Sequence, residues 1–462
     1  MERILVYYRR IRKRIFFIPL LYSLGGLVLA GAAIWADRSL TGNVTFPALM
    51  QVDRDLARGI FSTLVGALLT MITVSFSTIM VVLTMYSGQF SPRIARDFLE
   101  QKTSLRVLGL FMASFIYSIL SLYATGSARD IQPVISTTLG VLLALSCLGS
   151  FGYFIHHVAR SVQITGIIER ITGEILAAVD DDIHRIGNDA RAHTRLEGPA
   201  PEMLDEAWTQ VPSGRWGFVK EINYTSLADL GEEQGLILIL KTRVGAFLQE
   251  GDTLLMAFRT REETAPALTQ EEFSEKVQAL MELGEDRNSR EDLEFGIIKL
   301  VEIALRAISP GVNDPNTAIH CISKLGPILR KIGKELETIY YYGKSDIPRL
   351  FVPHISYQEL LYTTYHQLRH YGCGDVSVLA ALLDSLISIS GEGDAYKDTD
   401  KIWKMAGYMV EGLTLDGFAG MDLDYLNRRI RKLARLLNRE AEELLLVWPA
   451  REQTCDIQEE LI

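Results

Sequence analysis

Cysteines are scarce in this sequence, and their spacing excludes two kinds of site. The 462 residues include four cysteines, at Cys147, Cys321, Cys373 and Cys455. No two of them stand close enough to suggest a metal centre, and Cys147 falls within a long apolar run. We therefore expect neither a disulfide framework nor a metal site.

An excess of basic residues is also lacking. Lysine and arginine number 47 against 57 aspartates and glutamates, which gives a formal net charge of -10. Such a balance argues against nucleic acid as a partner. The chain contains no Walker loop, no Gly-x-Ser-x-Gly elbow, no His-Glu-x-x-His and no Cys-x-x-Cys, so no catalytic residue and no cofactor is expected.

Charge itself is missing from four long runs near the amino terminus. These are Ile15–Ala36, Gly59–Pro92, Val107–Ala128 and Ile131–Ala159. Each exceeds the roughly 20 residues that cross the hydrocarbon of a bilayer as a helix. The sequence thus predicts a transmembrane domain over residues 1–160, with spans at about 15–36, 60–86, 105–124 and 133–157, and the lipid bilayer as a partner.

Basic residues at the ends of these runs predict the orientation. They crowd the entrance of the first span, from Arg9 to Arg14, and recur between the second and third spans at Arg93, Arg96 and Arg106. On the opposite side the few arginines are accompanied by aspartates. The positive-inside rule then predicts a multi-pass protein with both termini in the cytoplasm.

The second run carries a polar stripe at helical spacing. Its members recur at intervals of three and four residues, at Thr63, Gly66, Thr70, Thr73, Ser77, Met80, Thr84 and Ser87. That spacing places them on one helix face. Hydroxyl groups at membrane depth indicate either tight helix contacts or a water-lined path. Because Thr70, Ser77 and Thr84 follow a heptad, the stripe also fits copies of one helix arranged around a symmetry axis.

No ionisable residue lies within the stripe, which disfavours a proton or metal transporter lined by acids. A pore of this kind takes its selectivity from charges at its two ends. The candidates are Asp53, Asp55 and Arg58 outside, with Arg93 and Arg96 inside, and membrane anchoring is the alternative role for these five. The expected partners are other copies of the chain and an inorganic ion or small ligand.

The remainder of the chain has the composition of a soluble protein. Isoleucines from Ile164 to Ile186 continue the helical spacing, so the last membrane helix is expected to run on as an amphipathic stalk, with a linker completing residues 161–213. Short β-rich runs between glycines predict a small β-module over 214–262. Long helical patterns predict a cytoplasmic helical domain over 263–450, followed by a tail at 451–462.

A helix-turn-helix sequence stands inside that helical domain. Its residues of interest are Arg306, Ser309, Pro310, Gly311, Asn313, Asp314 and Pro315. Pro310 and Gly311 end one helix, while Asp314 as amino-terminal cap and Pro315 at the first helical position begin the next. An exposed helix start here would hold an anion or the backbone of a neighbouring subunit; capping alone is the simpler alternative.

The chain resembles a bacterial family of predicted multi-span membrane proteins, domain-of-unknown-function family 2254. The resemblance rests on Gln89–Arg93 after the second span, on Leu300–Pro315, and on the order of membrane and soluble segments. It departs from the family at Asn316, and it implies an architecture and no activity. The predicted fold class is an α-helical membrane protein with four spans and a cytoplasmic α+β region.

Three functions remain open from the sequence. The first is a homo-oligomeric ion channel whose second span lines the path and whose cytoplasmic part forms a vestibule or sensor. The alternative is a membrane-anchored scaffold or signalling protein that binds a protein or small ligand in its cytoplasmic domain. A membrane enzyme comes third, without a catalytic motif to support it.

Overall fold

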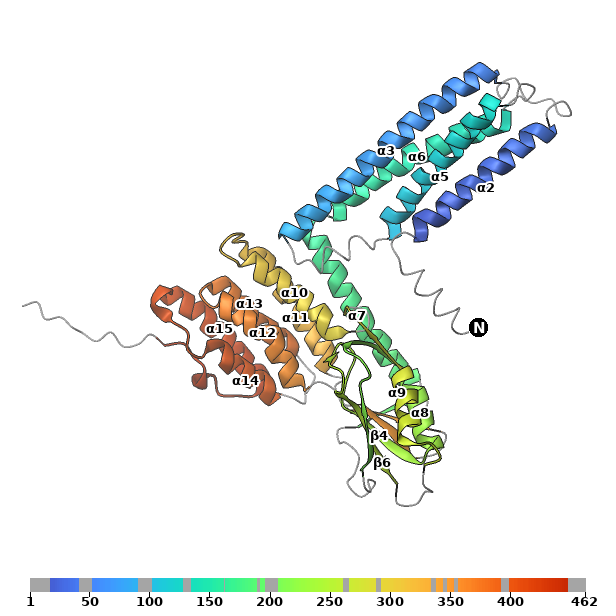
Figure 1. Cartoon of the computed structure of the whole chain (residues 1–462). Helices are drawn as coiled ribbons and strands as arrows, with labels where there is room; N and C mark the ends of the chain where they lie inside the picture. Colours follow the sequence, from blue (N-terminus) through green and yellow to red (C-terminus); the bar gives the residue numbers. More distant parts are fainter. Residues whose placement is uncertain are drawn as a thin grey trace, which may run out of the picture. The chain divides into compact units, whose positions relative to one another are not determined.

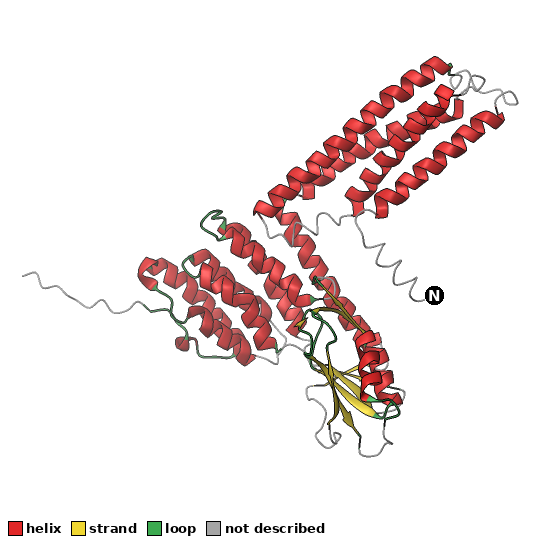
Figure 2. Cartoon of the chain, in the orientation of Figure 1, coloured by secondary structure: helices red, strands yellow, loops and turns green. Residues whose placement is uncertain are grey.

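The computed structural model describes most of the chain and divides it into two units, residues 1–167 and 168–462. The described residues are 17–40, 52–89, 102–127, 134–161, 163–188, 192–195, 207–260, 266–287, 292–333, 338–343, 347–352, 356–391 and 399–447. Figures 1 and 2 show the helices and strands of each unit. The predicted tail at 451–462 lies outside the described residues.

Four long helices form the first unit. They are α2 (Phe17–Leu40), α3 (Arg54–Gln89), α5 (Lys102–Ser127) and α6 (Val134–Ser161). All four are long and apolar enough to cross a membrane, which confirms the predicted number of candidate spans. Helix α5 packs against each of the other three, so it forms the centre of the bundle (Figure 1).

Glycines let these helices approach closely. A Cβ placed on Gly26 of α2 would lie 2.4 Å from the carbonyl oxygen of Ala113 in α5. On α6, a Cβ at Gly140 would lie 2.8 Å from the Phe61 ring of α3. In a bilayer, where burial of apolar surface gains little, such close packing is a main source of helix association.

Several polar contacts between helices lie at one end of the bundle. Asp37, at the end of α2, is buried and accepts hydrogen bonds from the backbone N–H groups of Ile135 and Ser136, at 2.8 and 3.2 Å. The carboxylate therefore caps the amino terminus of α6, where its charge also favours the helix dipole. Arg54 of α3 donates to the carbonyl oxygen of Thr125 in α5 at 2.8 Å.

The amphipathic helix α7 (Ile164–Asn188) is separate from α6, so the predicted continuous stalk is wrong. At the break, the N–H of Gln163 donates to the carbonyl of Arg160, three residues earlier. This bond has the spacing of a 3₁₀ turn and replaces an α-helical bond there. The predicted apolar face of α7 is nonetheless buried at Ile168, Ile171, Ile175 and Val179.

Strands of the second unit form two sheets, which extend well beyond the predicted module of residues 214–262. The six-stranded sheet has the order β1-β8-β9-β4-β6-β2 and the three-stranded sheet the order β5-β3-β7. Their bounds are β1 (Ala192–Arg195), β2 (Ala207–Pro212), β3 (Gly217–Ile222), β4 (Leu236–Leu240), β5 (Phe247–Leu248), β6 (Thr253–Arg259), β7 (Met281–Gly284), β8 (Thr338–Tyr342) and β9 (Pro348–Val352). The prediction missed β1, β2, β7, β8 and β9.

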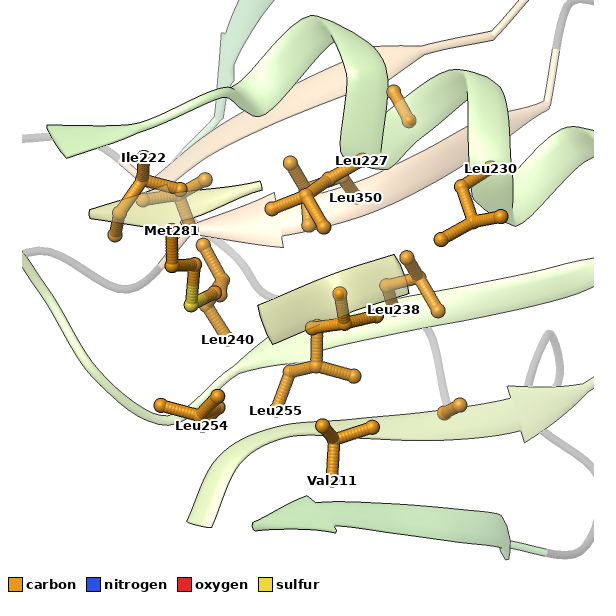
Figure 3. Packing of buried hydrophobic residues seen from close by; sticks show 14 of the residues in the cluster. Val211, Ile222, Leu227, Leu230, Leu238, Leu240, Leu254, Leu255, Met281 and Leu350 are labelled. Atoms are coloured by element: carbon orange, nitrogen blue, oxygen red, sulfur yellow. The ribbon is translucent and has the colours of Figure 1, made fainter. Parts of the chain in front are cut away.

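Two short helices complete this β-region. Helix α8 (Tyr224–Glu233) packs on β4, β8 and β9, and α9 (Gln270–Ala279) packs on β2 and β7. Leucines of β4 and β6 meet residues of α8 and β9 in one apolar core, in which Leu227, Leu238, Leu255 and Leu350 are fully buried (Figure 3). Strand β9 enters this core by pairing in parallel with β4.

Six further helices follow the pattern that the sequence predicts. They are α10 (Leu293–Ala307), α11 (Pro315–Gly333), α12 (Tyr357–Gly372), α13 (Val376–Ser390), α14 (Thr399–Val410) and α15 (Gly420–Leu437). The apolar helix α13 packs against α11, α12, α14 and α15. The last helix ends at Leu437 because Asn438 adopts a left-handed conformation (φ 53°), which stops a helix. The predicted fold class is confirmed.

We expect Gly26→Ala to destabilise the bundle, because its new methyl group would meet backbone atoms of Ala113 that cannot rotate away. Overpacking of this kind costs about 1–3 kcal/mol. The matched control is Gly25→Ala, since a Cβ at Gly25 meets nothing within 4 Å. Thermal unfolding of the detergent-solubilised protein should show a lower midpoint for Gly26→Ala alone; equal midpoints for the two variants would contradict this packing.

Candidate functional site

One row of side chains attaches α3 to the bundle. Ala57, Phe61, Leu68, Ser75 and Val82 follow each other at intervals of four or seven residues, and all five are buried. Phe61 is 0% exposed and Leu68 is 2% exposed. At 3.6 residues per turn these positions share one helix face. This face packs against α5 and α6.

The polar stripe lies on the opposite side of α3. Thr63, Gly66, Thr70, Thr73, Ser77, Met80 and Thr84 are all exposed in the single chain, and Met80 is 47% exposed. The side chain of Ser87 lies outside the described part of the helix. The stripe therefore makes no contribution to packing within the bundle and is left for lipid, water or another chain.

Most hydroxyls of the stripe are bonded within α3 itself. Thr63, Thr70, Thr73 and Thr84 each donate to the carbonyl oxygen four residues earlier, at 2.9 Å. Such bonds lower the cost of placing a hydroxyl at membrane depth. The stripe can consequently face lipid at modest cost, and it still offers oxygen atoms with acceptor capacity to water or a neighbouring helix.

Of the charges proposed for the pore ends, three lie in the described part of the chain. Asp53, Asp55 and Arg58 are exposed at the start of α3. Arg93 and Arg96 lie outside the described residues. The sequence indicates only that Asp37 is one of the charged residues between the first two spans. In the structure, Asp37 caps the amino terminus of α6. The two helices are far apart in sequence, so no local pattern reveals this contact.

The helix-turn-helix sequence around Pro310 forms the connection between α10 and α11. Helix α10 ends at Ala307, and Ser309 Oγ donates to the carbonyl oxygen of Arg306 at 2.7 Å. Asn313 adopts a left-handed conformation with φ of 50°. Asp314 accepts hydrogen bonds from the backbone N–H of Thr317 at 3.2 Å and from its hydroxyl at 2.6 Å. The structure thus supports the capping role.

Hydrogen bonds to this carboxylate lower the pKa of Asp314, chiefly that from the Thr317 hydroxyl and then that from the Thr317 N–H. The ionised cap is therefore stabilised in the folded state. Its contribution to stability is present above the unfolded pKa of an aspartate, about 3.9, and is lost as the pH falls through the lowered folded value.

Helix α7 is held on α11 by charged pairs. Glu169 accepts from Lys324 Nζ at 2.6 Å and lies 3.3 Å from His320 Nε2, while Asp180 pairs with Lys331 at 2.5 Å. The bond from Lys324 is the largest cause of a lowered pKa at Glu169, with a further contribution from His320. Helix α7 also lies close to α10. A Cβ added to Gly296 of α10 would lie 2.6 Å from the side chain of Ile175 in α7.

Residues 12–388 match the family described as "Predicted membrane protein (DUF2254)". The chain belongs to this family. It is 28% identical over 338 residues to the uncharacterized proteins Rv1290c of Mycobacterium tuberculosis and Mb1321c of Mycobacterium bovis. The match covers 72% of this chain and 64% of each relative. No solved structure matches the chain.

These comparisons and the four apolar helices together identify a membrane protein with four candidate spans. The family description and the names of the relatives assign no activity to it.

Asp314→Ala should weaken the start of α11 by about 0.5–2 kcal/mol, the usual cost of losing a helix cap. Hydrogen exchange of the amides of residues 315–333 would report the change locally. Asp314→Asn is the matched control, since asparagine caps as well as aspartate and does not titrate. Below pH 4, the protection of the α11 amides from exchange should fall in the wild type and persist in the Asn variant. If exchange in the Ala variant equals that of the wild type, Asp314 does not stabilise the start of α11.

Charge reversal tests whether the ion pairs hold α7. Glu169→Lys places like charges beside Lys324, so we expect faster amide exchange in residues 168–181 than in the wild type. The double variant Glu169→Lys/Lys324→Glu restores opposite charges and should restore slow exchange. If both variants exchange alike, the apolar contacts of α7 suffice and the pairs contribute nothing to its attachment.

Proposed function

We propose that this protein is a homo-oligomeric channel of a bacterial inner membrane, with α3 lining the path. The observation that carries the proposal is that the stripe points away from the bundle to which α3 belongs. Copies of the chain arranged around an axis would turn their stripes toward each other. A hydroxyl-lined path free of ionisable groups would result, with Asp53, Asp55 and Arg58 at one mouth.

Apolar side chains on either side of the stripe support this arrangement. Val74 and Val81 are exposed on one flank of α3 and Phe76 on the other. In an oligomer these residues would pack between neighbouring copies of α3, while the threonines between them would face the path. The region after α6 would then form a cytoplasmic vestibule or sensor, and both termini would be cytoplasmic by the positive-inside rule.

A second candidate is a membrane-anchored scaffold or signalling protein. The observation in its favour is that four threonines of the stripe already bond to their own helix, so a stripe that faces lipid is tolerated. In that case the four spans only anchor the chain, and the soluble unit performs the function by binding a protein or small ligand.

Cysteine accessibility separates the two functions. In a variant whose four native cysteines are replaced, Thr70→Cys, Ser77→Cys and Thr84→Cys should react with an aqueous thiol reagent, because the thiolate forms in water. Leu68→Cys, which faces the bundle, and Phe76→Cys, which is exposed off the stripe, are the matched controls. We expect the stripe positions to react at least about tenfold faster, and their modification to lower ion flux through proteoliposomes.

The same cysteine-free protein in intact cells tests the orientation, since Asn43→Cys should be labelled from the outer side. Ser77→Leu should reduce flux by narrowing or dewetting the path. A protein that passes no ions, with stripe cysteines as unreactive as Phe76→Cys, would establish the stripe as a lipid-facing or packing surface and would favour the scaffold.

A further inference from the structure

A ligand-sized cavity opens between α12 and α14 in the second unit. Its volume is about 450 Å³, and it is lined by Ser356, Gln358, Glu359, Tyr362, Lys401, Lys404, Met405 and Tyr408. Volumes of roughly 300–1,000 Å³ are typical of small-molecule sites. None of these residues belongs to the stripe of α3 or to the motif between α10 and α11.

Two facing rows of side chains build this cavity. Along α14, Lys401, Lys404 and Tyr408 follow at intervals of three and four, so they share one face of the helix. Tyr362 of α12 lies opposite, with its ring centroid 5.7 Å from that of Tyr408. Rows on two packed helices give the cavity rigid walls, which suits a binding site better than a loop does.

Aromatic rings form an open surface at this site. Tyr362 is 49% exposed, although the ring of His366 stacks on it at 4.9 Å with an angle of 11° between the planes. The guanidinium of Arg369 lies 4.8 Å from the ring centroid of Tyr408. These neighbours hold the rings of Tyr362 and Tyr408 in place, and the Tyr362 ring remains partly exposed. Such a surface is suited to stacking against the ring of a ligand.

The charge of the lining favours an anion. Lys401 and Lys404 contribute two positive charges, against one negative charge from Glu359. The cavity also includes Ser356 at the start of α12, and the Ser356 side chain makes no capping hydrogen bond to that helix. The first N–H groups of α12 therefore add a positive partial charge to the same side.

From the rings and the lysines together, we propose that the cavity between α12 and α14 binds a small organic anion with a planar ring, of the size of a mononucleotide. The ring would stack at Tyr362 and Tyr408 above Met405. The anionic group would accept hydrogen bonds from Lys404, with Lys401 close by. This site does not depend on channel activity, so it stands whichever function the membrane unit has.

The test uses the full-length protein in detergent and the fluorescent probe N-methylanthraniloyl-AMP, followed by anisotropy. We expect saturable binding that AMP displaces, whereas adenosine, which lacks the charge, and inorganic phosphate, which lacks the ring, displace it at least about tenfold less well. Lys404→Ala should weaken binding by at least about tenfold, the cost of one charge-assisted hydrogen bond. Lys404→Arg, which keeps the charge, should retain most of it.

The matched control is Lys432→Ala, which removes an exposed lysine of α15 that does not line the cavity. The proposal is overturned if no saturable binding occurs up to about 1 mM probe, or if Lys404→Ala and Lys432→Ala bind as the wild type does. If adenosine displaced the probe as well as AMP does, the site would not require an anionic group. If inorganic phosphate did so, the site would not require a ring, and either result would overturn the proposal.

Discussion

The contact between Phe61 of α3 and Gly140 of α6 fixes the direction in which α3 faces. The ring is fully buried and occupies the space that a side chain on Gly140 would need. In lipid, the burial of apolar surface between helices gains little free energy. Close packing of complementary shapes, such as a ring against a glycine, therefore determines which face of a helix is buried. Every position of the polar stripe follows from it, because a rotation of α3 by half a turn would bury the threonines and expose Phe61.

The sequence predicts the helices well because each helix depends on local information. Charge-free runs are sufficient to locate α2, α3, α5 and α6, and the cap at Asp314 marks where α11 begins. The sheets depend on distant pairs instead. Strand β4 pairs with β9 through Leu238 and Leu350, and no short window of sequence holds both partners. Strand β1, with four residues, also lacks the length that makes an alternating pattern visible.

The candidate site is only half predictable for a related reason. Spacing alone shows that Thr70, Ser77 and Thr84 share a face of α3. Whether that face is turned toward the bundle depends on the shapes of α5 and α6, which the spacing of α3 does not contain. The cavity between α12 and α14 depends on a tertiary contact in the same way, because Lys404 and Tyr362 come from helices that meet only in the folded chain.

The hydrogen bonds of the stripe determine what it still offers to its surroundings. Bonds to the preceding turn satisfy the hydroxyl hydrogens of Thr63, Thr70, Thr73 and Thr84. The oxygens keep unused acceptor capacity, and the helix backbone is bare at Gly66, where a Cβ would meet nothing within 4 Å. Lipid tails offer no donor to these oxygens. Water or a second polar helix would supply donors to these oxygens, and this difference from lipid is the physical ground on which the proposed shared axis rests.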